Sequence, residues 1–500
     1  MISLRVEEPM ADRSRAGIEM NFTFGKGRKP KSDRNPEAPF RMLVLGDFGG
    51  HASRAQVRPG AELRPQQVDL DRFPALFGKI APQIQIQLGD QPPLTIPISD
   101  LEDFHPDHLY STLEFFAPMR ELRRQLQDPS TFALAAAMIG SVAGVKPAVA
   151  APTASEMAAH GEDLQRLLGK PSAAEPAAVP PASAVETMIR QAVAPHVVGK
   201  TDPRQADLLA AVDAMTGELM RAVLHDPGFQ ALEAAWRGLD RLVRTLELDE
   251  SLQVHVLDIS RAELAEDFAA APSLAESALY GIVVDHVGDK PWSLLVDCNG
   301  YSRGQEDAAL LARLGTLAQE VDAAVLVGLG WPVFSAGFAS REDERAWAAL
   351  RNSTAATSIA LAVPNILSRL PYGKATEPTE RFVFTEQASP PVSSRYLWGS
   401  SALAVAQLLA QSFAAAGGWD FAPGDESTLG DLPTHITKQD GESVQTPCAE
   451  TWLPESKIDA LIKEGLIPMV SAQGRGEVRV PRFQSIASPP AALAGRWRND

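Results

Sequence analysis

The sequence predicts a mixed α/β protein in which a small α+β domain precedes a larger α/β domain. After residue 250, short apolar runs alternate with amphipathic helical patterns, which is typical of a mostly parallel sheet covered by helices. An Ala/Pro-rich stretch divides the chain, because such a composition cannot bury enough apolar surface to fold by itself. The 500 residues, 45% hydrophobic and 22% charged, suffice for about three domains.

Four parts follow from these patterns. We expect an extended arm over residues 1–35, a small domain over 36–142, a linker over 143–185 and a large domain over 186–500. In the arm, Ile18, Met20, Phe22 and Phe24 alternate with polar residues, which is the period-two pattern of a half-buried strand. Because a charged, proline-bearing spacer follows, the arm is predicted to exchange strands with a sheet that it does not itself complete.

The small domain is expected to begin with a buried strand over residues 42–45 that ends at Gly46 and Asp47. A second strand over residues 83–88 alternates apolar and polar side chains. A helical pattern begins after Pro106, where proline suits the first helical turn, and continues through residue 126. This order predicts a small α+β unit.

Helices begin the large domain. Apolar residues recur at intervals of three and four over 208–223 and again over 229–243, which predicts two amphipathic helices. Only a short interruption at 225–227 separates them, so we expect a helical hairpin.

The rest of the large domain is predicted to be a sheet with helices on its faces. Apolar runs that read as strands lie at 252–259, 292–298, 323–329 and 358–364. Helical segments separate them, which favours parallel pairing through crossover connections. A further helix is expected over 397–415, and strands and loops after it.

Composition excludes several classes of protein. The formal net charge of −17 argues against nucleic acid as a partner, because binding phosphates needs a basic surface. Two cysteines, Cys298 and Cys448, cannot build a disulfide framework or a four-thiolate zinc site. The N-terminus lacks the apolar core of a signal peptide, and the longest uncharged run, 323–339, is too short to span a bilayer. We therefore expect a cytoplasmic protein without membrane insertion.

No motif predicts catalysis, a metal or a cofactor. Residues 194–201, APHVVGKT, match a loosened phosphate-binding loop, but they follow a helical pattern and lack the inner glycine. His105 and His108 lack further spaced metal ligands, so His105 is interpreted as a helix-start residue. Cys298 is interpreted as an inert buried thiol at a strand end. The chain is therefore not expected to be an enzyme.

Several longer strings resemble the contractile sheath of bacterial type VI secretion systems. Residues 17–142 resemble the small (VipA-like) subunit, and the second region resembles the large (VipB-like) subunit in the same order along the chain. The matching strings of the first region are 17–26, 40–50 and 100–126, and those of the second are 225–243, 292–334, 364–386, 396–419 and 447–486. The chain thus looks like a fusion of both subunits through the linker.

This resemblance implies a structural role in a sheath that surrounds an inner tube, stands on a baseplate and is taken apart by an AAA+ ATPase. By position it also implies that ten residues belong to family motifs, in addition to the four arm residues of the strand exchange. Besides Ile18, Met20, Phe22 and Phe24 in the arm, the motif residues are Gly46, Asp47, Trp236, Arg237, Arg369, Pro371, Tyr372, Gly373, Trp398 and Gly399. We expect Trp236 and Arg237 on the hairpin, 369–373 in a turn, and Trp398 and Gly399 at the start of the late helix.

One departure from the family pattern leaves two functions open. Large subunits continue beyond the point that matches 483–486 with a strand-bearing segment, which we expect to be missing from this chain. The full set of motifs favours a fused small–large sheath protomer. The shortened end favours an adaptor or cap that docks on a sheath or baseplate without polymerising and regulates assembly.

Overall fold

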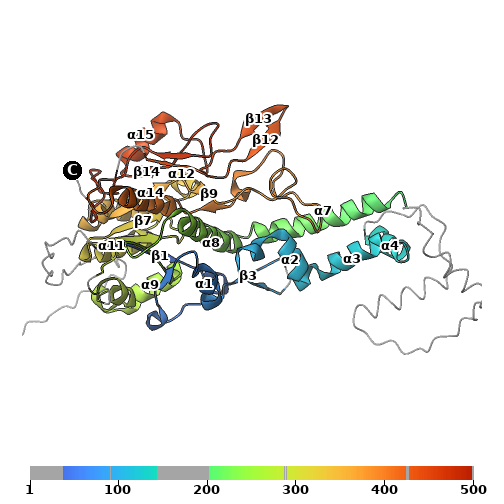
Figure 1. Cartoon of the computed structure of the whole chain (residues 1–500), viewed down its shortest axis with the longest axis horizontal. Helices are drawn as coiled ribbons and strands as arrows, with labels where there is room; N and C mark the ends of the chain where they lie inside the picture. Colours follow the sequence, from blue (N-terminus) through green and yellow to red (C-terminus); the bar gives the residue numbers. More distant parts are fainter. Residues whose placement is uncertain are drawn as a thin grey trace, which may run out of the picture.

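The computed structural model describes residues 38–89, 92–142, 202–285, 288, 290–423 and 427–497. Figure 1 shows a body of sheets and helices from which a few helices extend to one side. The helices are α1 (Phe73–Ile80), α2 (Pro106–Thr112), α3 (Ala117–Gln127), α4 (Phe132–Val142), α7 (Gln205–Leu224), α8 (Pro227–Thr245), α9 (Arg261–Ala270), α10 (Ala278–Tyr280), α11 (Gln305–Glu320), α12 (Trp331–Ala336), α13 (Arg341–Arg351), α14 (Ser401–Ala416) and α15 (Glu455–Lys463). The predicted α/β class is confirmed.

A seven-stranded sheet forms the centre of the body, in the order β14-β8-β7-β6-β1-β5-β2. All neighbouring pairs are parallel except β2 with β5 at one edge. Its strands are β1 (Phe40–Gly46), β2 (Gln66–Val68), β5 (Leu252–Asp258), β6 (Leu294–Asp297), β7 (Ala324–Gly328), β8 (Ile359–Val363) and β14 (Ile467–Pro468). The strands expected from apolar runs are therefore present, and the sheet is mostly parallel as predicted.

Smaller antiparallel sheets surround the central one. They pair β3 (Gln83–Ile86) with β4 (Leu94–Pro97), β9 (Ile366–Leu367) with β10 (Trp398–Gly399), and β12 (Ile436–Gln439) with β13 (Glu442–Gln445). A three-stranded sheet contains β11 (Ser427–Leu429), β16 (Val478–Val480) and β15 (Val470–Ser471). None of the helices in the described residues is long and apolar enough to cross a membrane.

Strand β1 comes from the first sequence region yet lies between two strands of the second. It pairs with β5 from Phe40 to Gly46 and with β6 from Met42 to Leu45. Alternate side chains of β1 enter the two hydrophobic cores that cover the opposite faces of the sheet. The two regions therefore do not pack as two separate units, because without β1 the backbones of β5 and β6 would lack hydrogen-bond partners in the middle of a sheet.

The expected helical hairpin is not what the structure shows. Helices α7 and α8 follow one another end to end along the molecule (Figure 1). The reason is local: Asp226 caps α8 by accepting hydrogen bonds from the amides of Gly228 and Phe229, and Pro227 is the first residue of that helix. The chain therefore passes from α7 to α8 within two residues and continues without reversing its direction.

Candidate functional site at the junction of the two regions

The first region, residues 38–142, packs against the residues after 202, and we call this contact the junction. Backbone hydrogen bonds join both ends of β1 to the second region. The amide of Phe40 donates to the carbonyl of Ser251 at 2.7 Å, and the carbonyl of Gly46 accepts from Ile259 at 2.9 Å. Glycine suits position 46, where a Cβ would lie 3.1 Å from the Phe48 ring.

Trp236, a predicted motif residue, anchors the junction from α8. Its indole Nε1 donates a hydrogen bond to the carbonyl of Phe48 at 3.0 Å. Its ring stacks on Phe77 with centroids 3.7 Å apart and meets the edges of Phe48 and Phe73. The indole is fully buried among side chains of the first region, so it holds α8 against that region.

A second tryptophan anchors the start of β1. Nε1 of Trp419 donates to the carbonyl of Ala38 at 2.6 Å, and its ring stacks on Phe40 at a centroid distance of 5.3 Å. Phe413 of α14 closes this group at 5.1 Å from Phe40. Sequence reasoning did not single out Trp419.

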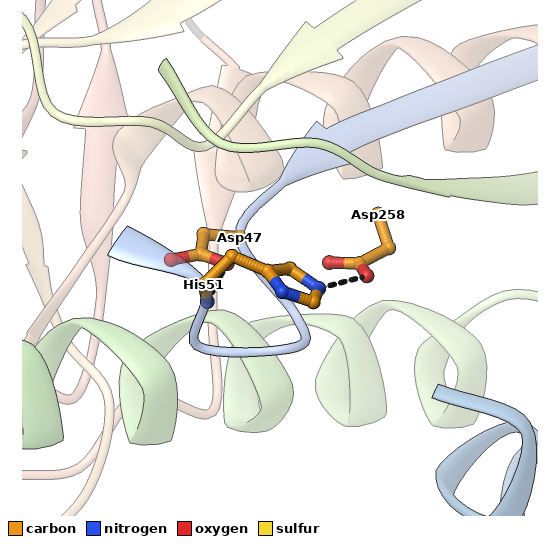
Figure 2. Close-up of side chains that lie close together, drawn as sticks. All are labelled: Asp47, His51 and Asp258. Carbon is orange, nitrogen blue, oxygen red and sulfur yellow. Dashed lines mark hydrogen bonds and ion pairs between the residues drawn. The ribbon is translucent and has the colours of Figure 1, made fainter. Parts of the chain in front are cut away.

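The turn after β1 is fastened to the end of β5 by a polar cluster (Figure 2). Both carboxylate oxygens of Asp47 accept backbone hydrogen bonds, from His51 at 2.7 Å and from Ala52 at 2.8 Å. Nε2 of His51 lies 2.9 Å from the carboxylate of Asp258, whose other oxygen accepts from the amide of Gly49 at 2.8 Å. Burial opposes a charge on His51, yet Asp258 raises its pKa above the ordinary 6.5.

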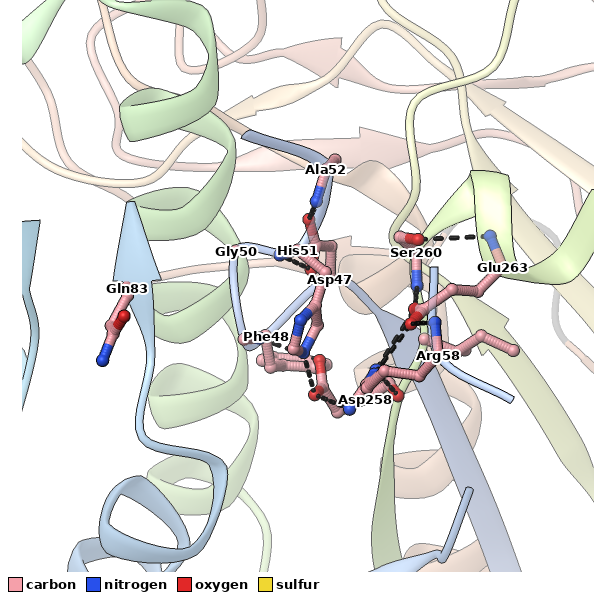
Figure 3. A network of polar contacts seen from close by, with 12 residues as sticks. Asp47, Phe48, Gly50, His51, Ala52, Arg58, Gln83, Asp258, Ser260 and Glu263 are labelled. Carbon is pink, nitrogen blue, oxygen red and sulfur yellow. Dashed lines mark hydrogen bonds and ion pairs between the residues drawn. The ribbon is translucent and has the colours of Figure 1, made fainter. Parts of the chain in front are cut away.

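Arg58 extends this cluster to α9 (Figure 3). Its guanidinium contacts Asp258 at 2.7 Å and Glu263 at 2.7 Å. Burial alone would raise the pKa of Glu263, but the hydrogen bonds from Arg58 and from the amide of Ser260 lower it to about 2. One arginine of the first region thus binds two carboxylates of the second.

A metal does not fit this cluster. Among the described residues, one group of at least three His, Cys, Asp or Glu side chains brings its potential metal-ligand atoms within 4.8 Å of one another. It consists of Asp47, His51 and Asp258. However, both Asp47 oxygens cap backbone amides, Nδ1 of His51 faces Arg54 at 3.0 Å, and Asp258 already binds Arg58. A cation would have to displace these donors beside two guanidinium groups. The cluster therefore has a structural role: it holds the turn after β1 against the end of β5.

Arg237, Arg369 and Tyr372, three predicted motif residues, meet in a buried ion cluster. Arg369 contacts Glu233 of α8 and Glu386, each at 2.7 Å, and Arg237 binds Glu233 at 2.7 Å. Arg237 also donates to the hydroxyl of Tyr372 at 3.1 Å, and the amide of Tyr372 donates to Glu386 at 2.8 Å. Burial would raise the pKa of Glu386, but Arg369 and further donors lower it to about 2. The cluster fixes the 369–386 segment on α8.

This segment also touches the first region. The ring of His105 meets Tyr372 edge-on at 4.9 Å, and the carboxylate of Asp107 accepts from the amides of Glu380 and Arg381 at 2.7 and 3.0 Å. The buried ion cluster therefore lies beside the junction, and the segment bridges α8 and α2.

The remaining motif residues have structural positions. The carbonyl of Pro371 accepts from the hydroxyl of Thr376, and the amide of Gly373 donates to the carbonyl of Glu377 at 2.8 Å, which closes the expected turn. A Cβ on Gly373 would meet only ordinary contacts, so packing does not require glycine there. Trp398 and Gly399 form β10 and do not start the helix, because Ser400 caps α14.

The structure tests two of the remaining candidates from the sequence, His105 and Cys298. The strand-exchange residues Ile18, Met20, Phe22 and Phe24, and the loop-like string 194–201, lie outside the described residues. The interpretation of His105 is confirmed, since its Nδ1 accepts from the amide of Asp107 at the start of α2. Burial raises the pKa of the Cys298 thiol far above its ordinary value, which keeps it protonated and a poor nucleophile.

Several important side chains were missed. Glu233 stands four residues before Arg237, a spacing that places both on one side of a helix and could have indicated the ion pair. Glu386, Asp258 and Arg58 carry no such local signal, because their partners are distant in sequence.

Two buried groups in the central sheet predict opposite responses to pH. Burial, with Arg41 and Arg72 nearby, lowers the pKa of His255 on β5 from 6.5 to about 4. The unfolded chain therefore takes up this proton at a higher pH than the folded chain, and the stability contributed by neutral His255 is lost as pH falls from 6.5 to 4.

Burial raises the pKa of Asp297 from 3.8 to about 6, against hydrogen bonds from Tyr301 and Asn299. Protonation of folded Asp297 therefore removes a destabilising buried charge, and the protein gains stability as pH falls from 6 to 3.8.

The unfolding free energy of His255→Phe minus that of the wild type is expected to increase by about 2 kcal/mol when the pH is lowered from 7 to 4.5. Asp297→Asn is expected to lose stability relative to the wild type as pH falls, because it lacks the buried charge that destabilises the wild type above pH 6. Urea unfolding across this pH range measures both differences. Parallel pH profiles for the wild type and both variants would contradict the prediction.

Comparisons with known proteins agree with this architecture. Residues 206–487, more than half of the chain, match the family model VipB, "EvpB/VC_A0108, tail sheath N-terminal domain". Residues 13–136 match the model "Type VI secretion system, VipA, VC_A0107 or Hcp2". The type VI secretion system sheath protein TssC1 of Pseudomonas aeruginosa is 29% identical over 335 residues, which cover 61% of this chain and 67% of that protein.

Among solved structures, a chain of the cryo-EM structure of the anti-feeding prophage (AFP) baseplate aligns with 51% of this chain at 13% identity and a TM-score of 0.28. The present chain spans 50% of the length of that one. The two family matches cover the two sides of the junction, with β1 in the first and β5 and β6 in the second. The chain belongs to the type VI secretion sheath family and carries the small-subunit and large-subunit regions in one polypeptide.

Proposed function

We propose that the chain is a single-chain protomer of a contractile sheath, in which the VipA-like region permanently supplies an internal strand of the VipB-like sheet. The observation that carries the proposal is the position of β1, which is hydrogen-bonded on both sides by β5 and β6. Fusion makes this pairing intramolecular, so its effective concentration no longer depends on the supply of a second subunit.

In this proposal the protomers pack around an inner tube in the cytoplasm, above a baseplate, and an AAA+ ATPase takes the contracted sheath apart. The arm around residues 18–24 pairs with the sheet of a neighbouring protomer, since its apolar face needs a sheet to cover it. The net charge of −17 leaves nucleic acid outside the set of partners.

Electron microscopy of the purified chain tests the proposal. We expect tubules from the wild type, alone or with separate small and large sheath subunits. Phe22→Asp places a charge on the apolar side of the arm and should abolish the tubules, whereas Thr23→Asp changes the polar side and should leave them intact. Discrete particles that shorten tubules of ordinary subunits would instead establish the adaptor or cap and overturn the protomer.

A further inference from the structure

Arg303, in the loop after β6, is held in an aromatic cage. Its guanidinium carbon lies 3.8 Å from the ring centre of Phe338, 5.1 Å from that of Phe334 and 5.6 Å from that of Trp347. The side chain is only 10% exposed. Three aromatic faces around one cation fix the orientation of the guanidinium.

This guanidinium lacks a proper acceptor. Among the described residues its one carboxylate neighbour is Glu464, at 3.9 Å, and its buried Nε has no hydrogen-bond partner. A guanidinium offers five N–H donors, and leaving a buried charge without acceptors is costly. The arrangement is thus set up to receive a carboxylate from outside the described fold.

The surface beside Arg303 has the composition of an interface centre. On α12, Val333 is 37% exposed, and the rings of Trp331, Phe334 and Phe338 are partly exposed next to it. Tryptophan and arginine are enriched among the residues that dominate binding energy, and α13 supplies a charged rim. We call Arg303, Trp331, Val333, Phe334 and Phe338 the Arg303 socket.

The β12–β13 hairpin projects from the body on its own (Figure 1). Its two strands pair only with each other, and an isolated two-stranded hairpin is marginally stable without further packing. Its base is anchored, because the hydroxyl of Tyr396 lies 2.6 Å from Nδ1 of His435 and the amide of Gly474 donates to Gln445. The base is thus held on the body, while residues 440–444 are exposed to a partner.

One face of this hairpin matches the socket chemically. Glu442 and Val444 are two residues apart on β13 and so share a face, and both are exposed. They offer a carboxylate beside an apolar side chain, which suits a guanidinium surrounded by apolar rings. Lys438 lies on the opposite face, since it pairs with Ser443. We call Glu442 and Val444 the Glu442 face.

We propose that the Glu442 face of one copy binds the Arg303 socket of the next copy. The inference deepens the proposed function and rests on it, because it names a contact through which sheath protomers join. The two surfaces are different parts of the chain, so the contact is heterologous and a pair of copies keeps one free socket and one free hairpin between them. Such contacts generate rings or open helical assemblies.

Sedimentation velocity of the full chain over a concentration series tests this contact. We expect the wild type to self-associate, and Glu442→Ala and Val333→Glu each to weaken association at least tenfold. Val333→Glu is the socket variant of choice because position 333 is exposed, so the fold tolerates it. Lys438→Ala on the other hairpin face and Arg124→Glu, 63% exposed on α3, are matched controls that should associate like the wild type.

Mixing the two variants gives a distinctive result. In the Phe22→Asp background, in which the arm no longer joins copies, Val333→Glu retains a working hairpin and Glu442→Ala a working socket, so an equimolar mixture should form dimers of one copy each and nothing larger. A monomeric wild type, variants that associate normally, or a mixture without such dimers would overturn the inference. The dimer requires no tubules, so it can succeed where the sheath experiment fails, and tubules from Val333→Glu would refute the contact while leaving the sheath protomer intact.

Discussion

Replacing Trp236 by alanine is expected to lower the free energy of unfolding by about 3–5 kcal/mol, the range for removing a fully buried aromatic side chain. The loss combines a cavity next to Phe77 with a Phe48 carbonyl that loses its indole donor. Since a native domain is stable by only about 5–15 kcal/mol, the change removes a large share of the total. Guanidinium unfolding should show a lower midpoint with an unchanged slope.

Two further variants separate the causes. Trp236→Phe keeps an aromatic ring and loses the indole donor, so we expect a loss of about 1–2 kcal/mol. Trp452→Ala removes a tryptophan that is 37% exposed and should cost much less than Trp236→Ala. Equal midpoints for Trp236→Ala and Trp452→Ala would mean that the indole does not hold the junction.

Five strands of the central sheet, β1, β5, β6, β7 and β8, were predictable, whereas β2, β14 and the order of the strands were not. Buried parallel strands are covered on both faces, so β6, β7 and β8 appear in the sequence as uninterrupted apolar runs. The insertion of β1 between β5 and β6 joins residues more than 200 positions apart, as Phe40 with Leu252. No local pattern encodes such a pairing, so the two regions looked like separate domains.

The end-to-end arrangement of α7 and α8 had a readable signal that was interpreted wrongly. Asp226 followed by Pro227 is a helix-start pair, which indicates that a new helix begins at once rather than after a turn. The buried ion cluster shows the opposite case: the arginine at position 369 stood out through the family resemblance, but its partner Glu386 became visible only when the chain was folded.

Replacing Arg369 by methionine is expected to cost about 3–5 kcal/mol, because Glu386 would stay buried without its arginine and Glu233 would keep only Arg237. Restoring neutrality should recover most of this loss, so the double variant Arg369→Met, Glu386→Gln, which leaves Glu233 paired with Arg237, is expected to unfold close to the wild type. Arg244→Met is the matched control, since that exposed arginine pairs with Asp240 on α8 and should contribute less than about 1 kcal/mol.

The pH dependence of the Arg369→Met variant distinguishes an unpaired charge from a simple loss of packing. In the wild type the pKa of Glu386 is about 2, below its ordinary 4.5, so its contribution is present above pH 4.5 and is lost as pH falls toward 2. Burial is the largest effect on the pKa of this carboxyl, so we expect the pKa to rise when Arg369 is removed and the folded variant to take up the proton at a higher pH than the folded wild type. The stability gap between variant and wild type should therefore narrow from pH 7 to pH 4. A gap that stays constant would show that Arg369 acts through packing on Tyr372 and not through its charge.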